Sequence, residues 1–278
     1  MIRLFASDLD GTLFNKYHKC DDKIENAIRE IVEHDRFFTV ATGRGINMVD
    51  LNGASSIAYY ICLNGSVIVD PNRKLLHSEP IDKDILNEII ETFGTAHLEY
   101  VAWNKVYSMF DKNEILGYRR KVWKEIADDS WLDNFLNNIT KNFEYSQSKE
   151  NILKQDICKI NYHFEDGESN AELDYFLKKY SNRLVNAPSG KGMYEITKYG
   201  VDKASGIQWL ANYLRIPKDE IAVYGDGGND ITMLEMYEHS YAPSTACDMV
   251  KEKAQQVIGP YNEYSVIEHM LKTIKTSE

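Results

Sequence analysis

Two aspartates one residue apart, Asp8 and Asp10, follow a short apolar run and directly precede Gly11. Side chains of an extended chain alternate between two faces, so both carboxylates would point the same way and repel each other. A cation, a shared proton or solvent must offset this repulsion. The spacing therefore indicates either a metal site or acid–base chemistry.

Three further polar segments stand where a predicted strand ends or a predicted helix begins. They are Thr42-Gly43-Arg44, Lys203, and the run Gly225-Asp-Gly-Gly-Asn-Asp230. In open α/β sheets, ligands bind at the carboxyl edge of the strands. We therefore expect Asp226 to converge with the first two aspartates if their strands are neighbours.

An all-oxygen ligand set of few carboxylates favours Mg²⁺ over Ca²⁺. A calcium-binding EF-hand loop is the competing explanation. Started at Asp8, it would place Leu13 where glycine is needed; started at Asp226, it would place Ile231 there. Neither register fits an EF-hand.

The same residue types can also carry phosphoryl transfer. An aspartate can attack phosphorus, and a second carboxylate can protonate the leaving oxygen and later deprotonate water. Thr42 offers a hydroxyl to phosphate oxygens, Lys203 a point charge, and Asn229 an amide. Together they predict a phosphoryl-transfer site with its metal.

The elements that must position these groups alternate between strand and helix at both ends of the chain. Apolar runs predict buried strands at 2–6, 37–41, 58–62 and 221–224, and a hairpin at 66–69 and 74–77. Amphipathic patterns predict helices at 24–32, 45–52, 203–214 and 231–237. The order implies parallel pairing with right-handed crossovers.

The middle of the chain has a different character. Helices are predicted at 81–93, 113–125 and 168–179, with aromatic-rich strands at 97–103 and 105–110 and a further strand at 157–164, while 140–155 carries no clear pattern. The predicted fold is α/β: a Rossmann-like parallel sheet with helices on both faces, formed by 1–81 and 189–278 and interrupted by an inserted α+β domain over 82–188.

The four polar segments, in this order, resemble the motifs of the haloacid dehalogenase superfamily. Asp8-x-Asp10-Gly-Thr matches its first motif, Thr42 its second, Lys203 its third, and 225–230 its fourth. The insertion between the second and third motifs is similar to the cap of the Cof-type phosphatases. Further matches are 41–44, Asn64-Gly65 and 194–197.

The resemblance implies a role for each matched position. Asp8 would be the nucleophile and Asp10 the general acid and base, and Asp8, the Asp10 carbonyl and Asp226 would hold Mg²⁺. Asp230 would support the metal ligands from close by. The phosphate would contact the remaining matched residues: Thr42, Gly43, Lys203 and Asn229. We place Arg44, Asn64, Ser189 and Lys191 on the substrate side of the site.

Three departures from the family pattern concern the rim of the site. Ala204 stands where the family usually has glycine, 242–246 reads Ala-Pro-Ser-Thr-Ala instead of Met-Gly-Asn-Ala, and 262–264 lacks the usual glycine. None of them removes a catalytic group. They leave the substrate open.

Composition narrows the classes of partner. The 278 residues include 43 acidic and 32 basic side chains, for a formal charge of −11, which disfavours nucleic-acid binding. We find no apolar run near the ~20 residues that span a bilayer. With no secretion signal and four widely spaced cysteines, we expect a cytoplasmic protein with free thiols. The oligomeric state is not readable.

The sequence thus predicts a Mg²⁺-dependent phosphatase acting on a small phosphorylated metabolite such as a sugar phosphate. Two alternatives stay open at this stage. A phosphomutase or phosphotransferase of the same superfamily would use the same residues, and a non-catalytic regulator would bind metal and phosphate without turnover.

Overall fold

The computed structural model describes residues 1–123, 129–164, 170–188 and 192–276. The chain divides into two compact units, the first formed by Met1–His77 with Val201–Glu278 and the second by Ser78–Gly200. The second unit begins four residues before the predicted inserted domain, 82–188, and ends twelve residues after it. Each unit has its own sheet.

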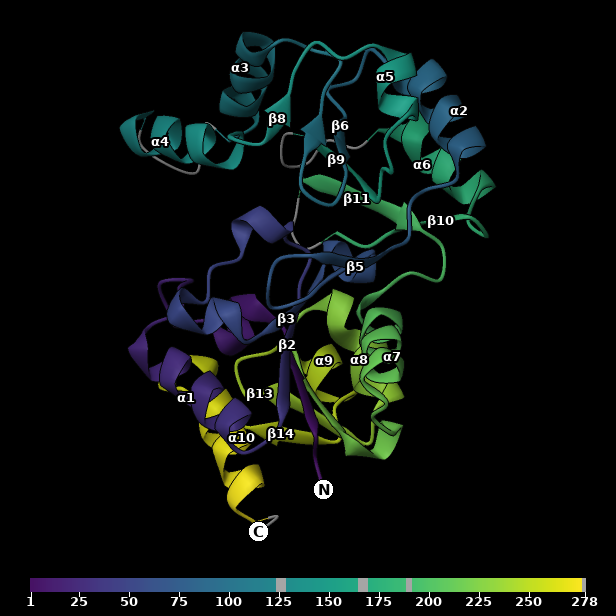
Figure 1. The fold of residues 1–278 in the computed structure, drawn as a ribbon. Helices are drawn as coiled ribbons and strands as arrows, with labels where there is room; N and C mark the ends of the chain where they lie inside the picture. The colour runs from purple at the N-terminus through teal and green to yellow at the C-terminus, as the bar shows by residue number, and fades with distance from the viewer. Residues whose placement is uncertain (124–128, 165–169, 189–191, 277–278) are drawn as a thin grey trace. The chain divides into compact units, whose positions relative to one another are not determined.

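The sheet of the first unit has eight strands in the order β14-β13-β12-β1-β2-β3-β4-β5 (Figure 1). The six strands from β14 to β3 are parallel, and β4 is antiparallel to β3. The strands are β1 Leu4–Ser7, β2 Phe37–Ala41, β3 Tyr59–Cys62, β4 Val67–Val69, β5 Leu75–Ser78, β12 Ile221–Tyr224, β13 His239–Pro243 and β14 Gln256–Ile258.

Helices cover both faces of this sheet, with α1 and α10 on one side and α7, α8 and α9 on the other (Figure 1). The strands next to the centre are apolar at successive positions because both of their faces are buried. Leu4 and Ala6 of β1 face the core under α7, and Phe5, between them, is fully buried on the opposite face. The helices are α1 Asp22–Glu33, α7 Lys203–Leu214, α8 Ile231–Met236, α9 Asp248–Lys251 and α10 Ser265–Lys275.

The second unit is an α+β module with a six-stranded sheet in the order β10-β11-β9-β6-β7-β8. One sheet face is apolar and packs against α2, α5 and α6. The strands are β6 Glu99–Val101, β7 Val106–Tyr107, β8 Phe143–Glu144, β9 Lys159–His163, β10 Leu184–Asn186 and β11 Met193–Lys198. The helices are α2 Lys83–Phe93, α3 Lys112–Trp123, α4 Asp129–Ile139, α5 Lys149–Leu153 and α6 Ala171–Lys179.

The predicted fold class is confirmed: a mainly parallel sheet with helices on both faces, interrupted by a second α/β unit. The helix predicted at 45–52 is wrong. The chain forms two short 3₁₀ turns there, Ile46–Met48 and Asn52–Ser56, because Val49 is extended and Asn52 takes a φ of 52°. The unpatterned stretch 140–155 contains β8 and α5.

Candidate active site

Two neighbouring parallel strands bring the first and fourth motifs together. Ser7 at the end of β1 lies opposite Tyr224 at the end of β12, and the Asp8 amide donates to the Tyr224 carbonyl at 2.8 Å. Asp8 and Asp226 therefore both follow the carboxyl ends of paired strands. This register is the reason that residues more than 200 positions apart share one site.

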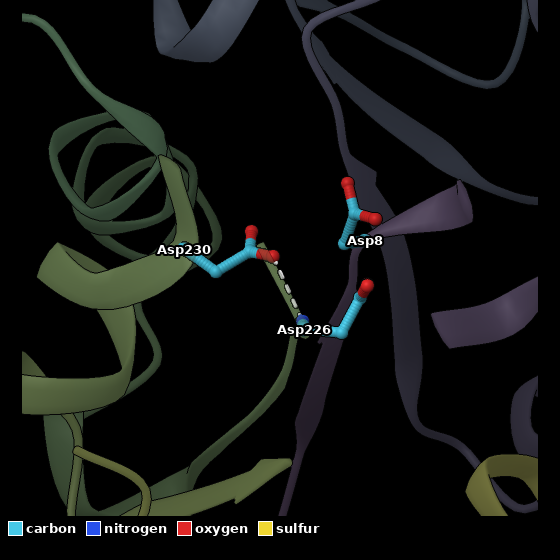
Figure 2. A group of neighbouring side chains, drawn as sticks. All are labelled: Asp8, Asp226 and Asp230. Carbon is cyan, nitrogen blue, oxygen red and sulfur yellow. Dashed lines mark hydrogen bonds between the residues drawn. The ribbon is translucent and has the colours of Figure 1, made fainter. Parts of the chain in front are cut away.

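Asp8, Asp226 and Asp230 form an acidic cluster (Figure 2). Each contributes a carboxylate oxygen, and the three oxygens lie within 4.8 Å of one another. Asp230 is held by its own loop, because its Oδ2 accepts hydrogen bonds from the Asp226 amide at 2.9 Å and the Gly227 amide at 2.8 Å. The loop thus fixes its carboxylate before any ligand arrives.

Lys203 provides the positive charge of the cluster. It is the first residue of α7, and its side chain is fully buried. Nζ donates to Asp8 Oδ1 and to Asp230 Oδ1, both at 2.6 Å. An ammonium buried without such partners would be strongly unfavourable, so the lysine and the two carboxylates depend on each other.

The pKa values follow from this burial. Burial raises the pKa of Asp8 to about 7 against the opposing effect of Lys203, and Asp230 and Asp226 add to the rise. Burial also raises the pKa of Asp226 to about 6. For Lys203, burial acts downward, but the two carboxylates outweigh it and hold the pKa above its usual value. Three carboxylates facing one ammonium leave the cluster short of positive charge.

The turn after β1 shapes the same site. Leu9–Leu13 is a turn with a kink at Asp10 and Gly11, where Gly11 has a φ of 81°, and a Cβ at this position would overlap the Asp226 carboxylate. Thr12, fully buried, donates from Oγ1 to Asp226 Oδ1 at 2.6 Å. Glycine therefore allows the Asp226 carboxylate to approach the backbone of this turn closely. The converging carboxylate oxygens fit a hard divalent cation such as Mg²⁺.

Asp10 points to a different set of partners. Arg44 donates to both of its oxygens, from Nε to Oδ2 at 2.8 Å and from Nη2 to Oδ1 at 2.5 Å. His18 Nδ1 lies 3.0 Å from Oδ1. Arg44, placed on the substrate side from sequence, is thus in contact with the predicted acid–base residue.

The second motif and the turn after β3 lie side by side. The Thr42 carbonyl accepts from the Asn64 amide at 3.0 Å, and the Arg44 carbonyl accepts from the Leu63 amide at 3.1 Å. A Cβ on Gly43 would come within 3.0 Å of Asn64 Oδ1. Asn229 Nδ2 donates to the same Oδ1 at 3.1 Å. Asn64 therefore joins the second and fourth motifs.

The predicted residues in the first unit come from five segments of chain that meet at the carboxyl edge of the sheet. Ser189 and Lys191 lie outside the described residues. The sequence reasoning gave no role to Thr12 or His18. Thr12 follows directly on the Asp-x-Asp-Gly pattern, a signal that could have marked it; His18 carries no such signal.

The parallel sheet is covered by helices on both faces and carries an acidic cluster at its carboxyl edge. This combination is typical of α/β enzymes, which bind ligands at that edge. A model of the haloacid dehalogenase-like hydrolase family matches residues 5–271. The chain therefore belongs to this family, as the motifs predicted, and it is a hydrolase of the phosphatase class.

Two curated proteins and one solved structure illustrate the likeness. The chain is 27% identical to phosphatase YwpJ of Bacillus subtilis, over 98% of this chain and 99% of that protein. It is 25% identical to the B. subtilis 5-amino-6-(5-phospho-D-ribitylamino)uracil phosphatase YcsE, over 92% and 89%. A solved haloacid dehalogenase-like hydrolase from B. subtilis superposes with a TM-score of 0.77 at 27% identity, covering 98% and 99%.

A membrane-crossing helix would need about 20 apolar residues in a row. Within the described part of the chain, every helix is too short or too polar for that role.

Proposed function

We propose that the protein is a Mg²⁺-dependent phosphatase that hydrolyses a small phosphorylated metabolite through a phosphorylated Asp8. The observation that supports this most strongly is the buried contact of Lys203 with Asp8, beside Asp226. The Lys203 ammonium fixes the orientation of the Asp8 carboxylate at the sheet edge, as a nucleophile requires. Its positive charge also favours an incoming phosphate.

In this mechanism Asp8 attacks phosphorus in line and the alcohol leaves from the opposite side. Asp10 gives a proton to the leaving oxygen and then takes one from the water that hydrolyses the aspartyl phosphate. Thr42 and Asn229 bind phosphate oxygens, and Lys203 offsets their charge. Asp230 keeps Lys203 in place through its 2.6 Å contact.

Asp8, the Asp10 carbonyl and Asp226 are the groups that would hold Mg²⁺. When bound, the ion supplies positive charge to the transferring phosphoryl group. The cluster's excess of carboxylates supports this assignment.

The second unit is proposed to select the substrate. One face of its sheet is apolar and covered by helices, but the other face carries charge. Glu99 and Glu195 lie on either side of Asn161 in the same row of the sheet, and both are buried. Glu99 accepts from Arg119, and Lys159 pairs with Glu195. Paired buried charges provide oriented polar groups at fixed positions, which suits recognition of a polar metabolite.

We propose a sugar phosphate or a related polyol phosphate as the substrate class. One relative described above is named for a substrate that carries a phosphorylated ribityl chain. A compact ester of this kind needs a phosphate site and hydrogen-bonding groups, and it needs no basic surface. The formal charge of −11 is compatible with such a substrate.

Product analysis tests the proposed reaction. Purified protein is incubated with a panel of sugar, polyol and aryl phosphates, with Mg²⁺ or with a chelator, and inorganic phosphate and isomerised ester are both measured. We expect phosphate release that needs Mg²⁺ and disappears in the Asp8→Asn variant. Isomerised sugar phosphate without phosphate release would instead indicate a mutase, and absence of turnover with every ester would indicate a regulator.

A further inference from the structure

The predicted acid–base residue is held by two side chains. Arg44 contacts both oxygens of the Asp10 carboxylate, and the imidazole of His18 lies 3.0 Å from Oδ1. The ring of His18 is otherwise open to solvent, with 63% of its side chain exposed. An exposed side chain normally samples several rotamers, so a fixed contact at this place needs a reason.

The loop that carries His18 supplies that reason. His18 has a φ of 55°, a left-handed conformation that is unfavourable for a residue other than glycine. The Asn15 side chain organises the turn: its Oδ1 accepts from the Tyr17 amide at 2.9 Å and the Lys19 amide at 3.3 Å. The His18 amide in turn donates to the Asn15 carbonyl at 2.9 Å. The backbone strain at His18 is thus supported by its own turn.

The turn is also fixed to the body of the first unit. Asn15 Nδ2 donates to Asp21 Oδ2 at 2.8 Å, and the Tyr264 hydroxyl donates to the same oxygen at 2.6 Å. Asp21 caps α1 by accepting from the Ile24 amide. A chain of hydrogen bonds therefore runs from the start of α1 to the backbone of His18, whose imidazole lies beside Asp10.

We propose that His18 is a positioning residue that, together with Arg44, holds the Asp10 carboxyl in the orientation needed for proton transfer to the leaving group. This inference rests on the proposed function, because it assigns a role within that reaction. Arg44 fixes the plane of the carboxyl by its two-point contact. His18 contacts Oδ1, which it shares with Arg44 Nη2, and so adds a second side chain that restricts rotation about the Asp10 side chain.

Such a role has a signature that general damage to the fold would not give. An aliphatic alcohol leaves only when it is protonated, whereas p-nitrophenolate leaves without a proton. Misplacing the general acid should therefore slow the first step for aliphatic esters alone. For the aryl ester, we expect kcat/KM to stay unchanged. Its kcat and KM would decrease by the same factor, because Asp10 is still needed as a base to hydrolyse the aspartyl phosphate.

The test compares His18→Gly, His18→Asn and wild-type enzyme on two esters. One is p-nitrophenyl phosphate, and the other is the aliphatic ester with the highest turnover in the phosphate-release panel. We expect the ratio of kcat/KM, aliphatic over aryl, to fall about tenfold in His18→Gly, a fraction of what a positioned acid supplies. Asparagine tolerates the left-handed backbone and keeps an N–H donor, so His18→Asn should recover most of the ratio.

Two further variants calibrate the measurement. Asp10→Asn sets the loss expected when the acid itself is removed, and it should exceed that of His18→Gly. Asp35→Gly changes another exposed residue with a left-handed φ, of 58°, and should leave the ratio unchanged.

If the ratio of kcat/KM, aliphatic over aryl, is unchanged in His18→Gly, the positioning role is overturned while the phosphatase function stands. Equal losses on both esters are one case of this result. A wild-type enzyme that hydrolyses neither ester would overturn the proposed function itself.

Discussion

Replacing Lys203 by methionine is the perturbation whose size the structure constrains most closely. The change keeps the length and apolar stem of a fully buried side chain and removes its charge. Two carboxylates, each 2.6 Å from Nζ, then lose their shared cation. Because Asp8, with a pKa of about 7, is already partly protonated in wild-type protein, the buried carboxylate left without its cation is neutralised only if the native variant binds one more proton than wild-type protein does.

The cost of that proton can be worked out. Holding a carboxyl protonated at pH 7 against an unfolded pKa of about 3.9 costs about 4 kcal/mol, at about 1.36 kcal/mol per pKa unit. This agrees with the loss of about 3–5 kcal/mol typical of breaking a buried ion pair. At pH 5.5 the same proton costs about 2 kcal/mol. The native variant binds the extra proton and the unfolded chain does not, so the deficit shrinks as pH falls.

Urea unfolding at pH 7 and pH 5.5, with a chelator present, measures the deficit. Lys253→Met is the matched control, because its 2.6 Å contact with Glu235 is solvent-exposed and should be worth less than about 1 kcal/mol. A Lys203→Met variant as stable as the control at pH 7, or one whose deficit grows towards pH 5.5, would refute the reasoning.

The remaining predictions concern the metal, a buried histidine and a glycine. Mg²⁺ at a hundredfold excess over its Kd should stabilise wild-type protein by about 2.7 kcal/mol in thermal unfolding. Asp226→Asn should abolish that stabilisation, and Asp219→Asn, an exposed control in the same unit, should keep it; a retained Mg²⁺ shift in Asp226→Asn would contradict the metal assignment. Burial lowers the pKa of His163 from 6.5 to about 4, against the opposing effect of Glu99. Because the unfolded chain then binds more protons, wild-type stability should fall relative to His163→Gln by up to about 1.4 kcal/mol per pH unit as pH drops from 6.5 towards 4; parallel stability curves would show that the histidine is not kept neutral. Gly65→Ala should lower stability by about 3 kcal/mol, because φ is 100° and a Cβ would overlap the Asp202 carbonyl. Gly200→Ala, at a φ of 78° with nothing near its Cβ, should cost about 1 kcal/mol; equal melting temperatures for the two variants would exclude the overlap.

Much of the first unit could be predicted because buried parallel strands are continuous apolar runs. Ile221–Tyr224 and Phe37–Ala41 are recognisable on this ground alone. Once those strands are taken as neighbours of β1, the meeting of Asp8 with Asp226 follows from topology. The longer elements of the second unit are also patterned in the sequence, although its shortest strands, such as Phe143–Glu144, are too short to show a period.

The contacts around Asp10 could not be predicted in the same way. His18 reaches that carboxylate through a turn that depends on side-chain hydrogen bonds of Asn15, and such bonds leave no periodic trace. The link between Asn64 and Asn229 likewise depends on a turn in which Leu63 and Asn64 both have positive φ. Sequence placed Asn64 on the substrate side, whereas its contact with Asn229 is visible only in three dimensions.

The central claim is that Asp8 becomes phosphorylated during turnover. The most direct measurement is acid quenching of enzyme in the steady state with a turned-over ester, followed by peptide mass spectrometry. The account predicts one phosphoryl group on the peptide that contains Asp8, present in wild-type enzyme and absent from Asp8→Asn. Phosphate release in wild-type enzyme with no phosphoryl group on that peptide, or undiminished release by Asp8→Asn, would contradict it.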